Sequence, residues 1–357
     1  MDPIRIEELQ LAARNHGMPL EALRYPVTPV GLHYLLTHYD IPAVDPGEWR
    51  LTIGGRVARP IALGLEDLRA RPAAELIATM ECAGNGRAML SPRPFSQPWL
   101  DEAVGTGRWR GAPLRPLLEE CGVLDDAVEA VFTALDRGTE NGLEQDFARS
   151  LSLADALGDD VLLAYELDGR PLPPQHGFPL RLVVPGWYGM TNVKWLSSIE
   201  LVDRPFGGPQ QAVSYRLRAA ESEDGEPLTR MLPRALLIPP GIPDFPTRER
   251  TLPAGRHALE GRAWSGWAPI ASVEVSTDGG DTWGAAIVHR DVDSPWAWCR
   301  FHLDWEAAPG RHELRCRATD AAGNGQPDEP AWNLGGYANN AVQRLTVTVA
   351  ANGRAPG

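Results

Sequence analysis

DVLLAYELDGRPLPPQHGFPLRLVVPG, residues 160–186, decides the fold of the first part of the chain. Its two apolar runs have the length of short buried strands, and the Gly- and Pro-rich segment between them is typical of a turn. Upstream, LGLEDLRAR (63–71) has apolar residues at helical spacing. Short helices and strands are therefore mixed from about residue 47 to 200, which predicts an α+β domain.

A second pattern begins after residue 230. Apolar and polar residues alternate there, and Asp-Gly and Gly-Asn pairs provide turn signals, which together indicate an all-β sandwich. The alternating segments are ASVEVSTDGGDTW (271–283), RHELRCRATDAAGN (311–324) and AVQRLTVTVA (341–350). The charged segment AAESEDGEPLTR lacks apolar periodicity and is interpreted as a linker. We predict a catalytic domain at 1–218, a linker at 219–230 and the sandwich at 231–350.

The overall composition excludes several classes of function. The chain has 357 residues, of which 43% are hydrophobic and 23% charged, and a formal net charge of −13. That charge repels nucleic acid and anionic membrane surfaces. No apolar run reaches the roughly 18 residues that a membrane span needs, and the first residues lack the apolar segment of a secretory signal. We expect a cytoplasmic protein that binds neither nucleic acid nor membrane.

Four cysteines, at 82, 121, 299 and 316, show no CxxC spacing, which argues against a zinc knuckle or a dithiol redox pair. Cys121, Cys299 and Cys316 lie in apolar or alternating contexts and are expected to be small core residues. Cys82, in MECAGNGRAML (80–90), lies instead in a glycine-rich loop. Its thiolate could be a nucleophile that needs a base, or one ligand of a metal whose other ligands come from elsewhere.

The loop ECAGNGR (81–87) resembles the cysteine loop of the sulfite oxidase family of molybdenum enzymes. The resemblance extends over nearly the whole chain in the family's order. Further matching segments are TPVGLHYLLTHYDIP (28–42), GRWRGAPL (107–114), residues 159–201, GRAWSGWAPIASVEVSTDGGDTW (261–283) and residues 318–347. It implies a molybdopterin-binding domain followed by an immunoglobulin-like sandwich that mediates homodimerisation.

The resemblance also implies a set of cofactor-binding residues. Cys82 would bind molybdenum beside the two dithiolene sulfurs of the pterin. The other implied cofactor-binding residues are His38, Asp136, His176, Arg181, Asn192, Val193 and Lys194. An arginine and a lysine suit a phosphate, while histidines and a carboxylate suit the mixed edge of a pterin. Taken without the resemblance, His176 would be a surface loop residue, Arg181 a solvated strand end, and Lys194 a lysine with a solvated head.

Three more residues are implied for the reaction pocket. Tyr215 matches the tyrosine that hydrogen-bonds an oxygen on the metal, Arg87 a pocket arginine, and Trp99 the pocket tryptophan. Two expected arginines are missing, because Leu36 and Gly335 occupy their positions. Arg14, in an upstream RNH, either is coincidental or folds back to replace the lost charge.

These substitutions affect the expected substrate. Each lost charged hydrogen bond would weaken sulfite binding by about 1.5–3 kcal/mol. Oxidation of sulfite to sulfate is the first interpretation. A molybdopterin reductase of a sulfoxide, N-oxide or other less charged substrate is the alternative, and a non-catalytic interaction protein with a degenerate site is the second alternative.

The partners follow from the same resemblance. No His-Pro-Gly-Gly haem signature occurs in the chain, so we expect no haem here and a separate electron acceptor, for example a c-type cytochrome. We expect a homodimer through the sandwich. Trp264, Trp267 and Trp283 would suit either its core or an interface, and the core is expected for most of them.

Overall fold

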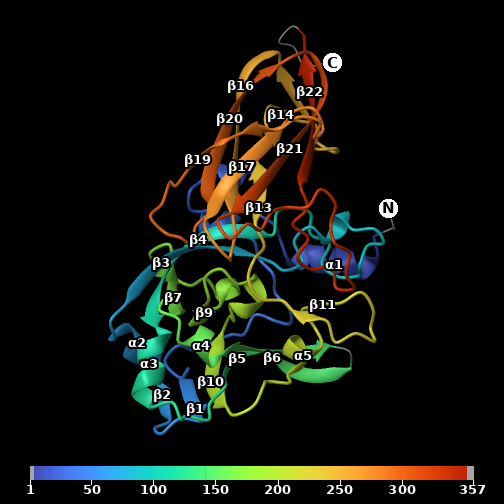
Figure 1. The fold of residues 1–357 in the computed structure, drawn as a ribbon. Helices are drawn as coiled ribbons and strands as arrows, with labels where there is room; N and C mark the ends of the chain where they lie inside the picture. The colour runs from blue at the N-terminus through green and yellow to red at the C-terminus, as the bar shows by residue number, and fades with distance from the viewer. Residues whose placement is uncertain (1–3, 141, 352–357) are drawn as a thin grey trace.

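The computed structural model describes residues 4–140 and 142–351. Figure 1 shows two bodies, a mixed α+β body from the first part of the chain and a body made of strands from the last part. The predicted fold class is therefore confirmed. The helices are α1 (Ile6–Arg14), α2 (Leu65–Arg69), α3 (Leu114–Cys121), α4 (Leu153–Ala156) and α5 (Pro209–Ala212).

Two sheets build the first body. One has the order β2-β1-β10-β5-β6, and its strands are β1 (Leu51–Gly55), β2 (Ile61–Leu63), β5 (Glu129–Glu140), β6 (Leu143–Ser152) and β10 (Leu196–Val202). The other has the order β3-β4-β7-β8, with β9 also paired to β7. Its strands are β3 (Ala74–Glu81), β4 (Val104–Pro113), β7 (Leu162–Leu167), β8 (Arg170–Pro171) and β9 (Arg181–Val183). Among the described strands of these two sheets, β1 and β10 are the one pair that runs parallel.

The stretch 160–186 forms strands because its apolar runs are buried. Residues 162–165 and all of β9 are buried, as expected for strands covered on both faces. β7 and β9 pair antiparallel, with Leu162 opposite Val183, so the turn between them returns the chain to the same sheet edge. That turn carries His176.

Alternation of apolar residues builds the sandwich. One sheet has the order β13-β16-β20-β19 and the other β14-β15-β22-β21-β17-β18. The strands are β13 (Arg234–Leu237), β14 (Ile242–Pro243), β15 (Arg250–Pro253), β16 (Gly255–Trp264), β17 (Ile270–Ser276), β18 (Gly284–Ala285), β19 (Ile287–His289), β20 (Cys299–Ala307), β21 (Gly310–Asp320) and β22 (Gln343–Ala350). In β21 every second residue from Leu314 is buried, as the sequence predicts.

The predicted burial of three cysteines is confirmed. Cys121 lies in the first body's core, and Cys299 and Cys316 lie in the sandwich core.

Between the bodies, β11 (Arg216–Leu217) and β12 (Glu226–Pro227) pair as a small antiparallel hairpin. The proposed domain boundaries stay a prediction.

Most of Trp264, Trp267 and Trp283 were expected in the core of the sandwich, and this expectation is wrong. Trp264 is buried, but it packs with Trp298 into the core of the first body rather than into the sandwich core. Trp267 is 53% exposed, and Trp283 is half-buried with the Arg317 guanidinium 4.1 Å from its ring centroid. The sandwich core holds a different tryptophan, Trp305, together with Phe301 and smaller residues. Within residues 4–140 and 142–351, no helix has the length and apolarity to cross a bilayer.

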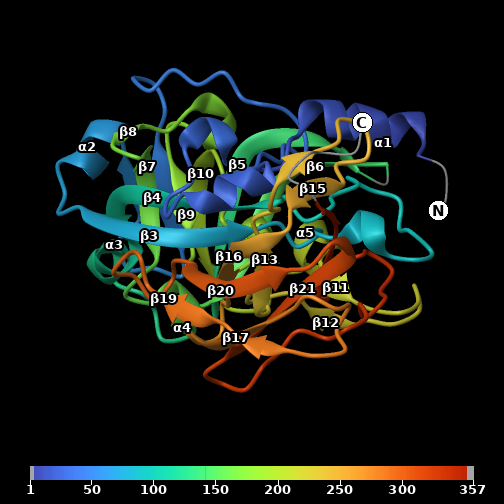
Figure 2. The same cartoon turned by 90° about the horizontal axis from the view of Figure 1, so that it is seen from above.

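The sandwich contacts strand β3 of the first body. Figures 1 and 2 both place β3 beside the base of the sandwich. The backbone N–H of Thr79 donates to the carbonyl of Trp296 at 2.9 Å, and the Trp298 N–H donates to the Thr79 hydroxyl at 2.8 Å. Because β3 leads directly into the loop that carries Cys82, the second body borders that loop.

Candidate functional site

Two adjoining cavities meet at Cys82. The first cavity is lined by His33, Tyr34, Leu35, Leu36, His38, Cys82, Ala83, Asp136, Phe147, His176, Arg181, Gly189, Met190, Asn192, Lys194, Trp195 and Tyr215. The second cavity is lined by Leu11, Leu36, Thr37, His38, Tyr39, Cys82, Gly84, Arg87, Ser96, Gln97, Thr139, Glu140, Gln210, Ser214, Tyr215 and Tyr337. Leu36, His38, Cys82 and Tyr215 line both, so these four form the boundary between them.

The cysteine loop is held by its own backbone and by Asn85. The Cys82 N–H donates to Ala103 at 2.9 Å, and the Ala103 N–H donates to the Asn85 side-chain oxygen at 3.0 Å. A Cβ added at Gly84 would lie 2.6 Å from the Arg87 guanidinium, which explains the glycine there. Burial raises the pKa of the Cys82 thiol, so a metal is the agent best suited to keep this sulfur deprotonated.

Contacts from the second body fix the same loop. The Glu81 carboxylate accepts hydrogen bonds from Trp264 Nε1 and from Arg234 Nη1, both at 2.9 Å. The Ala338 N–H donates to the Ala83 carbonyl at 2.8 Å. These partners were not predicted, because they lie more than 150 residues away in the sequence and carry no local motif.

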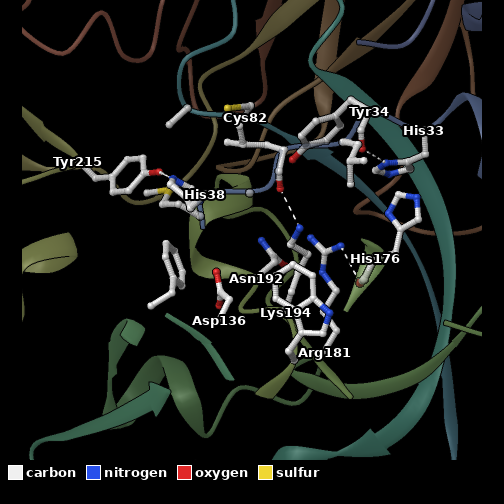
Figure 3. A pocket seen from close by; sticks show the side chains of 17 residues that line it. His33, Tyr34, His38, Cys82, Asp136, His176, Arg181, Asn192, Lys194 and Tyr215 are labelled. Carbon is white, nitrogen blue, oxygen red and sulfur yellow. Dashed lines mark hydrogen bonds between the residues drawn. The ribbon is translucent and has the colours of Figure 1, made fainter. Parts of the chain in front are cut away.

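The first cavity gathers buried basic groups at the end opposite Cys82 (Figure 3). Arg181, at the start of β9, is 5% exposed, and His176 is 3% exposed. Arg181 Nη1 donates to the His176 carbonyl at 3.3 Å, and its guanidinium lies 5.0 Å from the Trp109 ring centroid. The expectation of a solvated Arg181 and a surface His176 without the resemblance is therefore wrong, because the β7–β9 turn folds inward over Trp109.

Lys194 points into the same cavity. Its Nζ donates to the carbonyls of Leu36 at 2.8 Å and Gln175 at 3.1 Å, and lies 4.2 Å from the Trp195 ring centroid. Burial, with the positive charge of Arg181 nearby, lowers the pKa of Lys194 to about 7. Burial raises the pKa of the Asp136 carboxyl to about 6. A bound anion would restore the charged form of the lysine.

His33 is a cavity residue that the sequence analysis missed. It is 1% exposed, its Nδ1 contacts the Tyr34 carbonyl at 3.0 Å, and its Nε2 has no hydrogen-bond partner among the described residues. Its ring lies edge-on to His176, with centroids 5.6 Å apart. A buried ring nitrogen without a partner is a donor or acceptor available to a ligand. Its position within the matching segment 28–42 was the signal available.

Two further cofactor candidates, Asn192 and Val193, and the reaction-pocket candidate Trp99 lie in different places. Asn192 lines the first cavity, but its side chain accepts from the Val184 N–H at 2.8 Å and donates to the Tyr188 carbonyl at 3.2 Å, so it shapes the loop. Val193 is buried in the core and is not among the described residues that line either cavity. Trp99 is packed in the same buried cluster as Cys82 and likewise does not line these cavities within the described chain.

The second cavity centres on Tyr215. Its hydroxyl lies 2.5 Å from His38 Nε2, and its backbone φ of +53° is in the left-handed region, which costs about 1–3 kcal/mol in a residue other than glycine. The Tyr337 ring lies 5.1 Å from the Tyr215 ring. Arg87 Nε donates to Gly335 at 2.9 Å, and its guanidinium lies 5.1 Å from the Tyr337 ring centroid.

The two positions where arginine was expected contribute no charge. Leu36 presents an apolar side chain to both cavities, and a Cβ at Gly335 would overlap the Tyr337 ring. Tyr337 therefore occupies the space beside residue 335. Arg14 is exposed and is not among the described residues lining either cavity, so the idea that it folds back to replace the lost charge is wrong.

Known proteins share both bodies. The family "Oxidoreductase molybdopterin binding domain" matches residues 38–210, and "Mo-co oxidoreductase dimerisation domain" matches residues 246–350. Sulfite oxidase from Gallus gallus is 35% identical over 89% of this chain and 72% of its own. Mitochondrial sulfite oxidase from Homo sapiens is 32% identical over 98% of this chain and 67% of its own.

A solved structure has the same architecture. The sulfane dehydrogenase SoxCD from Paracoccus pantotrophus superimposes with a TM-score of 0.79 and 29% identity, covering 93% of this chain and 84% of that chain. The likeness thus spans both the cavities at Cys82 and the sandwich that borders them.

Proposed function

The chain belongs to the sulfite oxidase family of molybdopterin-dependent oxidoreductases, and from that premise we propose that it oxidises the sulfur of a small anion by oxygen-atom transfer. Sulfite is the reference substrate. We propose that a singly charged sulfur compound is favoured over doubly charged sulfite. The electrons leave to a separate acceptor, for which a c-type cytochrome is our proposal.

The residues of the first cavity fit the molybdenum cofactor. Arg181 is buried and Lys194 is half-buried, and no carboxylate of the described residues forms an ion pair with either. A buried cation without a counter-ion is costly, and the phosphate of a pterin cofactor would supply one. His33 and His176 offer polar edges to the pterin, and the Cys82 sulfur would hold the metal. When bound, the cofactor supplies the transferred oxygen atom and accepts two electrons.

The charge of the second cavity supports the proposed substrate. Arg87 contributes the one guanidinium among the described residues that line it, and Glu140 lines the same space. Leu36 adds an apolar wall. A doubly charged oxyanion needs several charge-assisted donors when it leaves water, whereas one arginine opposed by a carboxylate suits a smaller charge. The cavity measures about 240 Å³, which leaves room for a small organic group on the sulfur.

The chain's own side chains have distinct roles in this reaction. Arg87 would orient the anion so that the sulfur lone pair faces the Cys82 side of the cavity. Tyr215 and His38 share a short hydrogen bond, so this pair can hold a proton at the tyrosine oxygen beside the reacting atoms. In the balanced reaction the sulfur gains one oxygen, one water is consumed, and two electrons and two protons leave.

Reduction of a sulfoxide or N-oxide remains the second candidate, and the apolar side chain of Leu36 at the boundary of the cavities favours it. One assay series distinguishes sulfur oxidation from reduction of a sulfoxide or N-oxide. Ferricyanide reduction is measured with sulfite, methanesulfinate and dimethyl sulfide, and viologen oxidation with dimethyl sulfoxide. We expect the highest kcat/KM with methanesulfinate. Sulfoxide reduction without sulfur oxidation would overturn the proposal.

We also propose a homodimer, supported by the match of residues 246–350 to the dimerisation domain. Light scattering of the purified chain is expected to give twice the mass of 38.9 kDa. A mass that stays monomeric at micromolar concentration would contradict it.

A further inference from the structure

The buried arginines of this protein fall into two groups. Six arginines are buried in the part of the chain that the structure describes: Arg87, Arg149, Arg181, Arg234, Arg250 and Arg262. Arg234 pairs with Glu81 and Asp101, Arg250 with Glu21, and Arg262 with Asp291. The other three, Arg87, Arg149 and Arg181, have no ion pair with any carboxylate in residues 4–140 and 142–351. All three lie at or next to the cavities that meet at Cys82.

This division indicates where anions bind. A buried guanidinium without a counter-ion costs several kcal/mol. Arg181 faces the cavity that fits the cofactor phosphate, and Arg87 lines the cavity proposed for the substrate. Arg149 has no such assignment.

Arg149 lies on β6 behind Tyr215. It is 2% exposed, its Nη1 donates to the Gln210 carbonyl, and its Nε has no partner among the described residues. Its guanidinium lies 5.5 Å from the Tyr215 ring centroid. Burial lowers the pKa of Arg149 to about 10, so the side chain is still protonated at neutral pH. Tyr215 itself lines both cavities.

Consecutive contacts link Arg149 to Arg87. Arg149 contacts the Tyr215 ring, Tyr215 contacts the Tyr337 ring at 5.1 Å, and Tyr337 contacts the Arg87 guanidinium. Two tyrosine rings therefore lie between two unpaired cations. A cation over a tyrosine ring fixes the ring and makes its hydroxyl a stronger donor to an anion.

We propose that Arg149 is a positioning residue that sets anion specificity, acting through Tyr215 and supplying a second positive charge to the substrate cavity. This inference rests on the proposed function, because it assigns the substrate anion as the missing counter-ion. Arg87 and Glu140 line the cavity, and Arg149 lies against the Tyr215 ring that also lines it. Together these three groups carry one net positive charge, which matches a singly charged sulfur anion.

Binding of inorganic sulfate to the cofactor-loaded protein tests the charge without turnover. Arg149→Met and Arg149→Gln remove the charge, Arg149→Lys keeps it, and Arg115→Met removes an exposed arginine as the control. By calorimetry we expect the sulfate Kd to rise about tenfold in the two neutral variants. It should stay within about threefold for Arg149→Lys and within about twofold for Arg115→Met, because these keep the buried charge.

The outcomes separate this inference from the proposed function. A neutral variant that folds and binds sulfate as wild type does would overturn the role of Arg149, as would an Arg149→Lys variant that loses as much affinity as Arg149→Gln. Arg149→Gln keeps a neutral N–H donor at this buried position, so it serves if Arg149→Met does not fold. In turnover, the neutral variants should raise KM about tenfold for methanesulfinate and leave KM for dimethyl sulfide unchanged. Failure of wild type to oxidise any sulfur compound would instead refute the proposed function.

Discussion

The indole Nε1 of Trp264 donates a 2.9 Å hydrogen bond to the carboxylate of Glu81, the residue that directly precedes Cys82. A side chain of the sandwich therefore anchors the residue next to Cys82. Arg234, also from the sandwich, bonds the other oxygen of the same carboxylate. The position of the thiol thus depends on both bodies.

Removing Arg234 should destabilise the protein strongly. Arg234→Met leaves Glu81 buried with an unpaired charge, which is expected to lower the free energy of unfolding by about 3–5 kcal/mol. Arg256→Met breaks the exposed pair with Asp304 and should cost less than about 1 kcal/mol. Urea unfolding of both variants gives the comparison, and equal losses would count against the buried network.

The thiol of Cys82 should be required for metal retention. Cys82→Ser replaces a soft thiolate with a hydroxyl, so we expect loss of sulfur oxidation and a lower metal content. Elemental analysis for molybdenum and tungsten measures the metal content. Cys121→Ser, which changes a buried thiol elsewhere, is the control. A Cys82→Ser protein with full metal and full turnover would refute the assignment.

A methyl group at position 84 should weaken anion binding. In Gly84→Ala the new Cβ meets the Arg87 guanidinium, which must move from its bonds to Gly335 and Gln97. We expect KM for the sulfur anion to rise about tenfold, the equivalent of one lost charged hydrogen bond. Gly31→Ala, where the added Cβ has nothing within 4 Å, should behave as wild type.

The hydroxyl of Tyr215 should act on turnover more than on binding. Tyr215→Phe keeps the ring contacts with Arg149 and Tyr337 but removes the group that bonds His38. Loss of one preorganised donor lowers kcat by about 100-fold in comparable sites, and KM should change little. Steady-state kinetics with ferricyanide measures both constants. An unchanged kcat would show that the Tyr215 hydroxyl has no role in the reaction.

The cofactor-free protein should lose stability as the pH falls. Burial lowers the pKa of His33 to about 4, below its ordinary value of 6.5, so the unfolded chain binds this proton first. The resulting stability is complete above about pH 6.5 and is lost as the pH falls toward 4. From pH 7 to pH 5 this histidine alone contributes a loss of about 2 kcal/mol. Urea unfolding at both pH values should show a shallower dependence in His33→Asn.

Local patterns predicted the fold class well. The apolar runs at 160–186 became β7 and β9, and alternation with turn pairs marked the sandwich strands, because burial of one or both faces imposes these patterns on neighbouring residues. Cys121 and Cys316 were buried for the same reason.

The site was predictable only through the family resemblance. The side chains around Cys82 come from segments far apart in the sequence, and no local rule places His33 beside His176 or Arg149 behind Tyr215. Tyr337 is a further example, since its contact with Arg87 joins residues 250 positions apart. Residues such as these are defined by tertiary packing, and a single sequence carries no periodic signal for them.

The cysteine loop has consequences for how the polypeptide can be divided. Its carbonyls at Ala83 and Gly86 bond Ala338 and Asn339, and Glu81 bonds Arg234 and Trp264. A truncation near residue 230 would remove all of these anchors at once. The smallest autonomous fragment that keeps the sulfur in place must therefore extend through β22, and any chimera that exchanges the sandwich must bring its matching anchor residues along.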